Sequence, residues 1–472
     1  MAGPGVAARP RASRRLAARL CARVRAGLRA LGLAAALSGL AASVPGLAPA
    51  VAGLSGHGGP VTAVAVAPDG RLGLTASFDY TLKLWDLDRQ VVLQTLRGHD
   101  GAVTTVAFLP DSRHALSGGD DGTLRLWDAA YGQELHRFAA HQGKVSDVAL
   151  APDGRLAASA GWDGRVRLWD LEARRARRTL DERAGMVNAV AFTADGRHVV
   201  AVGAQGRAHL HPVDPDSAVE ELPGQGLGIN ALALTGDGRA LAGGVDGRLH
   251  VWSLADGTRL DAMEAHDGPL SAVAVAGDGD TVATSGTDGV IRLWALGTQT
   301  LRHTLEAVGA PVWDLAFAPD GARLLAAGGD GTARLFDVAS GVPIGGPVRP
   351  TASRLPDPDS RGAQLFRKCA ACHTLTQDGG HRAGPTLYQL FGREAGGLDG
   401  YDYSKALERA EIVWTPETVS RLFAQGPHVV TPGSKMPIQR MPDADDRQAL
   451  IAYIQRHAMP DGREPAGSEK KE

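Results

Sequence analysis

Cysteine is scarce in this chain, which has only three among its 472 residues. Cys21 lies in an N-terminal segment that we expect to be removed, so the mature chain would keep only Cys369 and Cys372. Two cysteines this close together exclude the disulfide framework of a small secreted domain. The sequence also lacks a glycine-rich phosphate loop and a nucleophile with a base beside it. We therefore expect the chemistry of the protein to depend on the segment around Cys369 and Cys372.

The first fifty residues lack acidic side chains and contain eight arginines. They run into an apolar stretch of alanine, leucine and glycine from Ala30 to Leu47, and small residues follow at 48–52. A basic region, an apolar region and small residues in this order are typical of an export signal. We expect residues 1–52 to be an export signal or an N-terminal anchor, with a mitochondrial import sequence as the alternative.

Removal of this leader changes the charge of the chain. The formal net charge of -2 includes the eight leader arginines, so it falls to about -10 without them. A chain with this balance has no basic footprint for nucleic acid. We expect no nucleic-acid partner, and membrane contact only through an uncleaved N-terminal segment.

The run Cys369-Ala370-Ala371-Cys372-His373 places an imidazole directly after two thiols. In c-type haem attachment each cysteine adds to one vinyl group of the porphyrin, and the histidine that follows ligates the iron. The two-residue gap between the cysteines suits one helical turn. Taken alone, the pattern also fits a structural CxxC or a thioredoxin-type redox pair, so the residues that follow must decide.

Three methionines after the motif are candidates for the second axial ligand of the iron. Met436 lies in the loop 431–437, which can present a side chain without a helix to constrain it. A soft thioether suits low-spin iron and raises its potential. We therefore predict His373 and Met436 as the axial ligands, with Met441 as the alternative to Met436. Met459 falls at or after the last expected helix and is interpreted as a packing residue.

About residues 360 to 460 resemble the mitochondrial cytochrome c and bacterial cytochrome c2 family, and the matching stretches follow the family order. They are Gly384-Pro385-Thr386-Leu387, Leu390-Phe391-Gly392-Arg393, Gly400-Tyr401-Asp402-Tyr403-Ser404, Val413-Trp414-Thr415 and the loop from Pro432 to Met436. The resemblance implies one covalent haem c in an all-α class I cytochrome c domain. It also implies that the Pro385 carbonyl accepts a hydrogen bond from the ring of His373. Three further residues are implied to hold the haem propionates: Arg393, Tyr403 and Trp414.

Two features depart from the family pattern. The stretch 422–427 is one residue longer than in the family, and lysines are few around the expected haem rim. We therefore do not expect a ring of lysines to select the redox partner.

A repeat occupies most of the chain before this segment. Seven equivalent positions recur at steps of 42 residues, with one step of 41: Asp79, Asp121, Asp163, Gln205, Asp246, Asp288 and Asp330. Residues 61–66 and 81–85 alternate as strands do, and the repeat carries Gly-His, Pro-Asp-Gly and Trp-Asp landmarks. This period resembles the WD40 family. The resemblance implies an all-β propeller of seven four-stranded blades.

Histidines recur near the start of four copies of the repeat: His57, His99, His141 and His266. We interpret them as structural, because each can bond the turn aspartate and a strand hydroxyl of its own blade, as His99 could with Asp121. In the fourth copy His209 and His211 stand two residues apart, so their side chains share one face of a strand. They are candidates for a metal or haem ligand, against the alternative that this copy of the repeat has drifted.

The sequence thus predicts a multidomain protein, an all-β seven-bladed WD40 propeller followed by an all-α class I cytochrome c domain. The expected boundaries are 1–52 for the leader, 53–345 for the propeller, 346–360 for a proline-rich linker, 361–460 for the cytochrome c domain and 461–472 for a polar disordered tail. Either residues 342–348 or residues 51–54 could supply the outer strand of the last blade. The linker would let the two domains move relative to each other.

These features favour an exported c-type cytochrome that transfers single electrons, with redox partner proteins docking on the haem edge or on the propeller. Its compartment would be the periplasm, either free or membrane-anchored, or alternatively the mitochondrial intermembrane space. Two other functions stay open. One is an enzyme similar to cytochrome cd1 nitrite reductase, whose propeller has eight blades and a second haem. The other is a haem-based redox sensor whose propeller binds a target in only one oxidation state.

Overall fold

The computed structural model describes residues 53–181, 185–214, 219–224, 226–306, 310–345, 355–370, 373–376, 384–398, 401, 403–432, 436 and 440–458. Several predicted features lie outside these residues: the leader 1–52, most of the linker, Cys372, Met459 and the tail 461–472. The described residues form seven β-sheets and, after residue 355, five helices.

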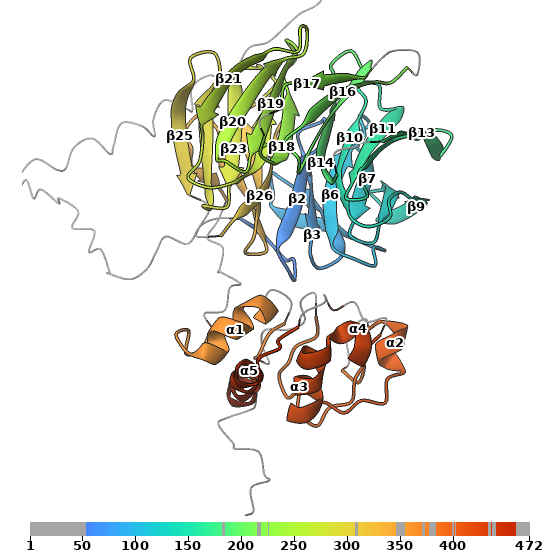
Figure 1. The fold of residues 1–472 in the computed structure, drawn as a ribbon, viewed down its shortest axis with the longest axis vertical. Helices are drawn as coiled ribbons and strands as arrows, with labels where there is room; N and C mark the ends of the chain where they lie inside the picture. The colour runs from blue at the N-terminus through green and yellow to red at the C-terminus, as the bar shows by residue number, and fades with distance from the viewer. Residues whose placement is uncertain are drawn as a thin grey trace, which may run out of the picture. The chain divides into compact units, whose positions relative to one another are not determined.

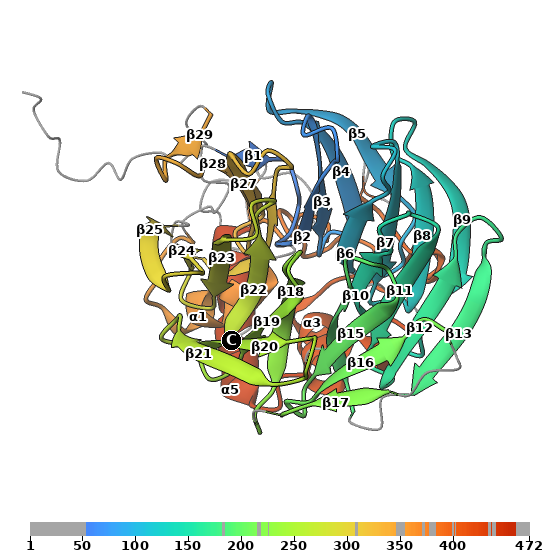
Figure 2. The same ribbon diagram turned by 90° about the horizontal axis from the view of Figure 1, so that it is seen from above.

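The seven sheets are antiparallel blades arranged around a common axis (Figure 2). The inner strands are β2 (Val61–Val66), β6 (Val103–Phe108), β10 (Val145–Leu150), β14 (Val187–Phe192), β18 (Ile229–Leu234), β22 (Leu270–Val275) and β26 (Val312–Phe317). The second strands are β3 (Leu72–Ser77), β7 (His114–Gly119), β11 (Leu156–Gly161), β15 (His198–Gly203), β19 (Arg239–Gly244), β23 (Thr281–Gly286) and β27 (Arg323–Gly328). Each inner strand packs against that of the next blade, and β26 packs against β2, so the ring closes.

The third strands are β4 (Thr81–Asp86), β8 (Thr123–Asp128), β12 (Arg165–Asp170), β16 (Ala208–Pro212), β20 (Arg248–Ser253), β24 (Val290–Ala295) and β28 (Thr332–Asp337). The outer strands of the first six blades are β5 (Val91–Arg97), β9 (Gln133–Ala139), β13 (Arg175–Asp181), β17 (Glu220–Leu222), β21 (Arg259–Glu264) and β25 (Thr300–Glu306). Every outer strand ends the strand order of its sheet. One edge of each outer strand is therefore not paired with another described strand.

The turn between β2 and β3 shows how local sequence sets the register of a blade. Gly70 has φ +73°, a left-handed conformation that favours glycine. Its N–H donates to the Ala67 carbonyl at 2.8 Å, and the Ala67 N–H donates to the Leu72 carbonyl at 2.9 Å. The turn brings Val66 opposite Gly73 across the strand pair. The alternating apolar residues of β2 are therefore placed on the faces that neighbouring blades cover.

The fourth copy of the repeat, which lacks the Trp-Asp ending, still folds as a four-stranded blade. His211 of β16 pairs with Val199 of β15, in the register in which Trp85 pairs with Gly73 in the first blade. The His211 side chain is buried, so it takes the place of the tryptophan between sheets. The prediction of seven blades is confirmed.

Six blades are tied to the next blade by the second residue of the inner strand, whose side chain donates to a backbone carbonyl there. The donors and acceptors are Thr62 and Val103, Thr104 and Val145, Ser146 and Val187, Asn188 and Ile229, Asn230 and Leu270, and Ser271 and Val312. The last blade has Trp313 at this position. There the next residue, Asp314, accepts a hydrogen bond from the Val64 N–H of the first blade at 2.8 Å. Asp314 therefore links the last blade to the first.

The last blade takes its outer strand from both candidate segments. In β1 (Leu54–Ser55), Leu54 pairs with Ala333 of β28. In β29 (Pro343–Ile344), Ile344 pairs with Leu335 of the same strand. Two short segments thus share one edge of β28, so both of the segments that the sequence left open contribute to the last blade.

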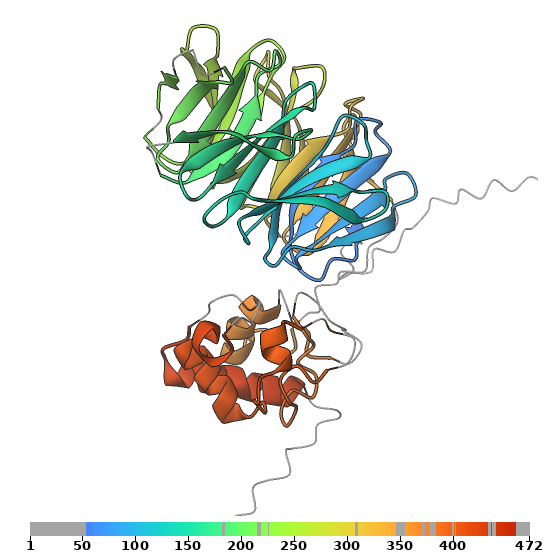
Figure 3. The same ribbon diagram turned by 90° about the vertical axis from the view of Figure 1, so that its right-hand side faces the viewer.

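The C-terminal domain consists of helices joined by loops (Figures 1 and 3). The helices are α1 (Arg361–Ala370), α2 (Lys405–Glu408), α3 (Pro416–Gln425), α4 (Pro427–Val430) and α5 (Ala444–His457). Thr415 begins α3 with a reciprocal capping box, and Asp443 caps α5 through its side chain. The core of the domain includes Phe366 of α1, Phe423 of α3 and Leu450 of α5. The predicted all-α cytochrome c domain is confirmed.

Helices α1 and α5 approach each other closely at a glycine. A Cβ atom on Gly362 would lie 2.5 Å from Cβ of Tyr453 and 2.6 Å from the Ala449 carbonyl oxygen. Residues 355–359, which the sequence assigned to the linker, also contact this domain, because the Tyr453 hydroxyl donates to the Pro356 carbonyl at 2.7 Å. The part of the connection outside the described residues is therefore 346–354.

Candidate functional site

The first cysteine of the motif lies in the last turn of α1. Cys369 is buried and packs in the domain core with Phe366 and Leu390. The His373 N–H donates to the Cys369 carbonyl at 2.9 Å, which is the four-residue spacing of a helical hydrogen bond. The end of α1 therefore holds His373 next to the first thiol.

The ring of His373 is oriented by the loop that contains Pro385. Nδ1 of His373 lies 2.7 Å from the Pro385 carbonyl oxygen. The loop is fixed to the histidine segment by the Leu387 N–H, which donates to the Thr374 carbonyl at 2.8 Å, and by a 2.8 Å bond between the Thr374 and Thr386 hydroxyls. A proton on Nδ1 makes Nε2 the nitrogen with the lone pair. This is the arrangement of a histidine that ligates a metal through Nε2.

Gly384 lets the backbone approach the face of the same ring. A Cβ atom at this position would lie 2.2 Å from Cε1 and 2.6 Å from Nδ1 of His373. Contacts this short do not occur in packed proteins, so any side chain at 384 would displace the imidazole. Gly384 therefore acts as a positioning residue for His373.

The three residues implied to hold propionates lie around the same loop. The Arg393 guanidinium donates to the Thr386 carbonyl at 2.8 Å and to the Tyr388 carbonyl at 3.2 Å. The Trp414 N–H donates to the Arg393 carbonyl at 2.9 Å, and the Trp414 indole packs against the core. Burial lowers the pKa of Arg393 and raises the pKa of Tyr403, although the attraction between the two groups opposes both shifts. The structure thus brings Arg393, Tyr403 and Trp414 into one neighbourhood, with Thr386 joining it to the histidine.

The two candidate methionines differ in how their backbones are held. Both side chains are half-buried against the core of the helical domain. The Met441 N–H donates to the Phe423 carbonyl of α3 at 2.8 Å, and its carbonyl accepts from Arg447 at 2.6 Å. Met436 stands between segments 433–435 and 437–439, which lie outside the described residues. Met441 is thus fixed by two backbone bonds to α3 and α5.

The residues of this site fit a covalently attached haem. Thiol, imidazole and thioether are donors for porphyrin attachment and for low-spin iron. The close approach of Gly384 fixes the His373 ring on one side, and the Pro385 carbonyl fixes its tautomer.

Three contributors were not singled out from the sequence: Gly384, Thr374 and Thr386. Gly384 and Thr386 belong to a stretch whose match was recognised as a block, but only its proline was given a role. Since Gly384 acts by having no side chain, its role depends on the distance to an imidazole eleven residues earlier. Only the folded loop shows that distance.

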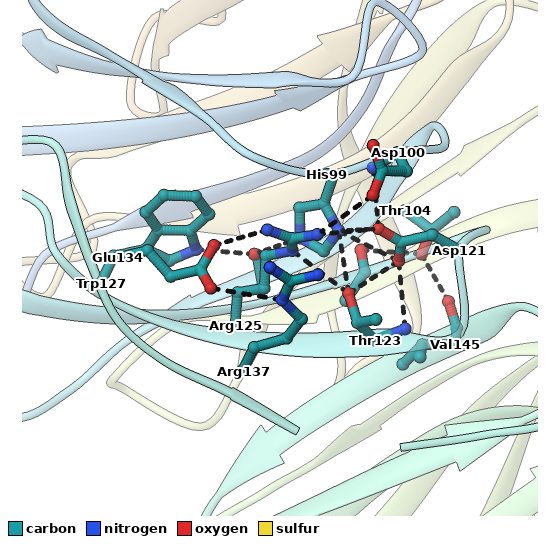
Figure 4. A network of polar contacts seen from close by, with 12 residues as sticks. His99, Asp100, Thr104, Asp121, Thr123, Arg125, Trp127, Glu134, Arg137 and Val145 are labelled. Atoms are coloured by element: carbon teal, nitrogen blue, oxygen red, sulfur yellow. Dashed lines mark hydrogen bonds and ion pairs between the residues drawn. The ribbon is translucent and has the colours of Figure 1, made fainter. Parts of the chain in front are cut away.

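The four recurring histidines of the propeller lie in separate networks, each within its own blade. In the second blade, Nδ1 of His99 lies 2.9 Å from the Asp121 carboxylate, and Nε2 lies 2.7 Å from the Ser117 hydroxyl, which also accepts from Trp127 (Figure 4). The equivalent sets in the first, third and sixth blades are His57, Asp79, Thr75 and Trp85; His141, Asp163, Ser159 and Trp169; and His266, Asp288, Thr284 and Trp294. The structural interpretation of these histidines is confirmed.

These networks hold their carboxylates ionised. Burial alone would raise the pKa of Asp163, but hydrogen bonds from His141 and Arg167 lower it to about 2. Burial lowers the pKa of His141 despite the attraction of Asp163. In each blade, the network therefore joins the segment before the inner strand to the second and third strands. The four networks do not form a shared site.

His209 and His211 lie close together on β16, with ring centroids 5.8 Å apart. Among the residues that the structure describes, no group of three or more His, Cys, Asp or Glu side chains could hold a metal ion. His211 instead pairs within its blade as the substitute for a tryptophan. The described residues thus provide no ligand set around these two histidines.

Comparison with known proteins matches both parts of the chain. A family model described as "Cytochrome c" matches residues 360–458. A second, described as "WD domain, G-beta repeat", matches residues 49–86, 90–128, 132–170, 217–253, 257–295 and 299–337. The unmatched interval 171–216 contains β14, β15 and β16 of the fourth blade, whose Trp-Asp ending is absent.

Relatives with known names match the C-terminal segment. Cytochrome c of Gibberella zeae is 40% identical over 95 residues, which cover 20% of this chain and 89% of that protein. Cytochrome c of Chlamydomonas reinhardtii is 38% identical over 96 residues, covering 20% of this chain and 85% of the relative. Cytochrome c of Theileria parva is 39% identical over 102 residues, covering 21% and 87%. Each comparison spans most of a whole small protein.

Proposed function

Because the chain belongs to the cytochrome c family through its C-terminal domain, we propose that it is an exported carrier of single electrons with one covalent His/Met haem. The observation that carries this proposal is the position of His373, whose Nδ1 lies 2.7 Å from the Pro385 carbonyl while Gly384 packs against its ring. A structural CxxC or a thioredoxin-type pair needs no such histidine. A haem bound here supplies one-electron transfer with both axial positions of its iron occupied.

Each residue of the site has a distinct task in this proposal. Cys369 and Cys372 attach the porphyrin, and burial of Cys369 in the core fixes one attachment point relative to α1. Pro385 keeps the proton on Nδ1 of His373 and makes Nε2 the better donor. Arg393 holds the loop of Pro385 and brings positive charge to the haem surroundings.

Met436 is the sixth ligand in this proposal. The alternative, Met441, has its N–H bonded to Phe423 of α3 and its carbonyl bonded to Arg447 of α5, so its backbone is held between those helices. A sixth ligand would come from a segment that is not held by such backbone bonds. Met436 lies in the stretch that resembles the family's ligand loop.

Export is proposed from the leader and from the chemistry of haem attachment. Residues 1–52 have the order of an export signal, and attachment to such motifs takes place outside the bacterial cytoplasm. The periplasm, either free or anchored, is the proposed compartment. Among the described residues, no helix is long and apolar enough to cross a membrane.

The propeller is proposed to act as the docking scaffold for redox partners. Seven sheets around one axis give a rigid body whose loops and edges can present a large surface. A nitrite-reductase type of propeller would have eight blades, whereas the described residues form seven sheets in a closed ring. The proposal therefore assigns the electron chemistry to the C-terminal domain and recognition to the propeller.

The sixth ligand is tested by replacing each methionine in turn. Met436→Ala in the full-length haem protein is expected to remove the iron–sulfur charge-transfer band of the ferric spectrum and to lower the reduction potential. Met441→Ala is the matched control and is expected to keep the band. Loss of the band in Met441→Ala alone would contradict the assignment of Met436.

A further inference from the structure

The outer strand of the third blade has an unusual concentration of positive charge. Four arginines stand within five residues: Arg174, Arg175, Arg177 and Arg178. We call residues 174–178 the arginine strand; they begin at the turn before β13 and continue into it. Arg174, Arg175 and Arg177 are exposed, and Arg178 is half-buried. This charge stands out because the chain as a whole has a formal net charge of -2.

These arginines have no carboxylate partner within salt-bridge distance among the described residues. Some other arginines of the propeller do: the exposed Arg113 pairs with Asp128 at 2.6 Å, and the half-buried Arg323 pairs with Asp88 at 2.8 Å. Asp170 and Glu172 are the nearest acidic residues before the cluster, and Asp181 ends β13 after it. The Asp170 carboxylate accepts a bond from the Ala173 N–H at 2.8 Å, which fixes the turn.

The side chains of the arginine strand reach toward both neighbouring blades. The Arg174 guanidinium donates to the Leu135 carbonyl of β9 at 3.4 Å. The Arg178 guanidinium donates to the Pro212 carbonyl of β16 at 3.1 Å. Because carbonyl oxygens carry no net charge, these contacts hold the two side chains without neutralising them. The positive surface therefore spans the edges of the second, third and fourth blades.

Protection of a sheet edge against aggregation does not account for this cluster. Charged residues can serve that purpose on edge strands. The equivalent strand of the first blade, however, exposes Val91, Val92 and Leu93. The fourth blade ends in Glu220 and Glu221 instead. The other outer strands have at most one arginine each, so the concentration of four arginines is particular to this edge.

The surroundings favour a protein over a lipid surface. Elements that bind anionic membranes combine basic residues with large apolar side chains that enter the bilayer. The exposed large apolar residues nearest in sequence are Trp162 and Met186, and neither belongs to β13. A guanidinium can instead pair with a carboxylate through two parallel hydrogen bonds. The unpaired edge of β13 offers backbone groups as well, to which an extended segment can bond.

We propose that the arginine strand binds an acidic polypeptide segment of the redox partner. The inference rests on the proposed electron-transfer function and names the partner chemistry for it. Over residues 355–458 the C-terminal domain has three lysines and nine arginines against twelve acidic residues, so it carries no net positive charge that would attract an acidic segment. The propeller then supplies the docking charge, and docking speeds up the encounter at low ionic strength.

The test uses the full-length haem protein and a fluorescent polyglutamate peptide as the probe. Arg175→Gln/Arg177→Gln removes two charges whose side chains make no hydrogen bond or ion pair with the described residues of the propeller. Binding of polyglutamate at low salt is expected to weaken about tenfold, and binding to the unmodified protein is expected to fall as salt rises. The matched control is Arg71→Gln/Arg97→Gln, which changes two exposed arginines of the first blade. This control is expected to change the affinity for polyglutamate by no more than about twofold.

Two outcomes would overturn the proposal. One is an equal loss of polyglutamate binding in both pairs of variants, which would indicate only the general charge of the molecule. The other is a selective loss of binding to phosphatidylglycerol vesicles without any effect on polyglutamate, which would make the strand a membrane contact. The ferric spectrum and reduction by ascorbate are recorded for every variant. A protein without a haem spectrum, or one whose haem ascorbate cannot reduce, would count against the electron-transfer function. The polyglutamate result would then be judged separately.

Discussion

At the scale of single residues, the candidate site depends on two groups that contribute no side-chain chemistry. The Pro385 carbonyl fixes the tautomer of His373, and Gly384 leaves room for its ring. Both lie in one short loop, which two contacts between Thr374 and residues 386–387 hold in place. Ligand geometry is thus set by backbone placement.

Replacement of Gly384 tests this placement. Gly384→Ala is expected to displace the imidazole, since the new methyl group would lie 2.2 Å from Cε1 of His373. We expect a lower yield of covalent haem and a ferric spectrum with a weakened or absent iron–sulfur band. Gly397→Ala is the control, because the nearest atom to its Cβ would be the Glu394 carbonyl oxygen at 3.2 Å. Normal haem content and an unchanged spectrum in Gly384→Ala would contradict the positioning role.

At the scale of elements, the inner strands carry two carboxyl groups, on half-buried aspartates, that join blades. Asp314 of β26 accepts from the Val64 N–H of the first blade, and Asp147 of β10 accepts from the Val190 N–H of the fourth blade at 2.9 Å. Burial raises the pKa of Asp314 to about 7 and that of Asp147 to about 6, and Asp147 further raises the pKa of Asp314. Their hydrogen bonds to backbone N–H groups oppose these shifts without cancelling them.

A raised pKa in the folded state makes the propeller less stable as pH rises. Below about pH 4 both folded and unfolded Asp314 are protonated, so the carboxyl group costs nothing. Between about pH 4 and pH 7 the unfolded chain loses the proton first, and the free energy of unfolding falls by roughly 3 kcal/mol. Asp314→Asn removes this dependence. The stability of the variant relative to the unmodified protein is therefore expected to grow as pH rises from 4 to 8, as measured by urea denaturation.

The control for this measurement is Asp320→Asn, an exposed aspartate in the turn after the same strand. Its stability is expected to follow the unmodified protein at every pH. If the difference in the free energy of unfolding between Asp314→Asn and the unmodified protein stays constant from pH 4 to pH 8, Asp314 is not the source of the pH dependence.

The elements themselves were largely predictable, because each repeat contains its own turn and strand signals. The Pro-Asp-Gly turn and the alternation in residues 61–66 both appear as expected. Blade closure was not predictable in full, since β1 and β29 have only two residues each and carry no pattern long enough to read. The docking of Pro356 on Tyr453 was missed for a related reason. A proline-rich composition indicates a linker but does not show where it meets a folded surface.

The histidine networks illustrate a different limit. Their residues could be paired from the repeat alone, because equivalent positions recur in blade after blade. The position of Gly384 against His373 has no repeat to reveal it and depends on a single tertiary contact. Periodic features of this protein can be predicted from sequence, whereas the contacts that occur once require the fold.

At the scale of the whole molecule, the propeller and the C-terminal domain each have their own core. The apolar clusters of the blades contain no residue after 344, and the cluster of the helical domain contains none before 355, among the residues described. Cys369→Ala/Cys372→Ala is therefore expected to abolish covalent haem while the propeller keeps its thermal transition. Circular dichroism and the absorbance of the purified protein measure the two effects. Loss of the propeller transition together with the haem would show that the domains depend on each other.

The central claim is that one low-spin haem with His/Met ligation is attached to this chain. The most direct measurement is the pyridine haemochrome spectrum of the full-length protein, expressed in a host that matures c-type cytochromes, combined with its ferric spectrum. The account predicts one covalent haem per chain and an iron–sulfur charge-transfer band. A chain without covalent haem, a second haem, or an iron that binds nitrite or oxygen at an open position would contradict it.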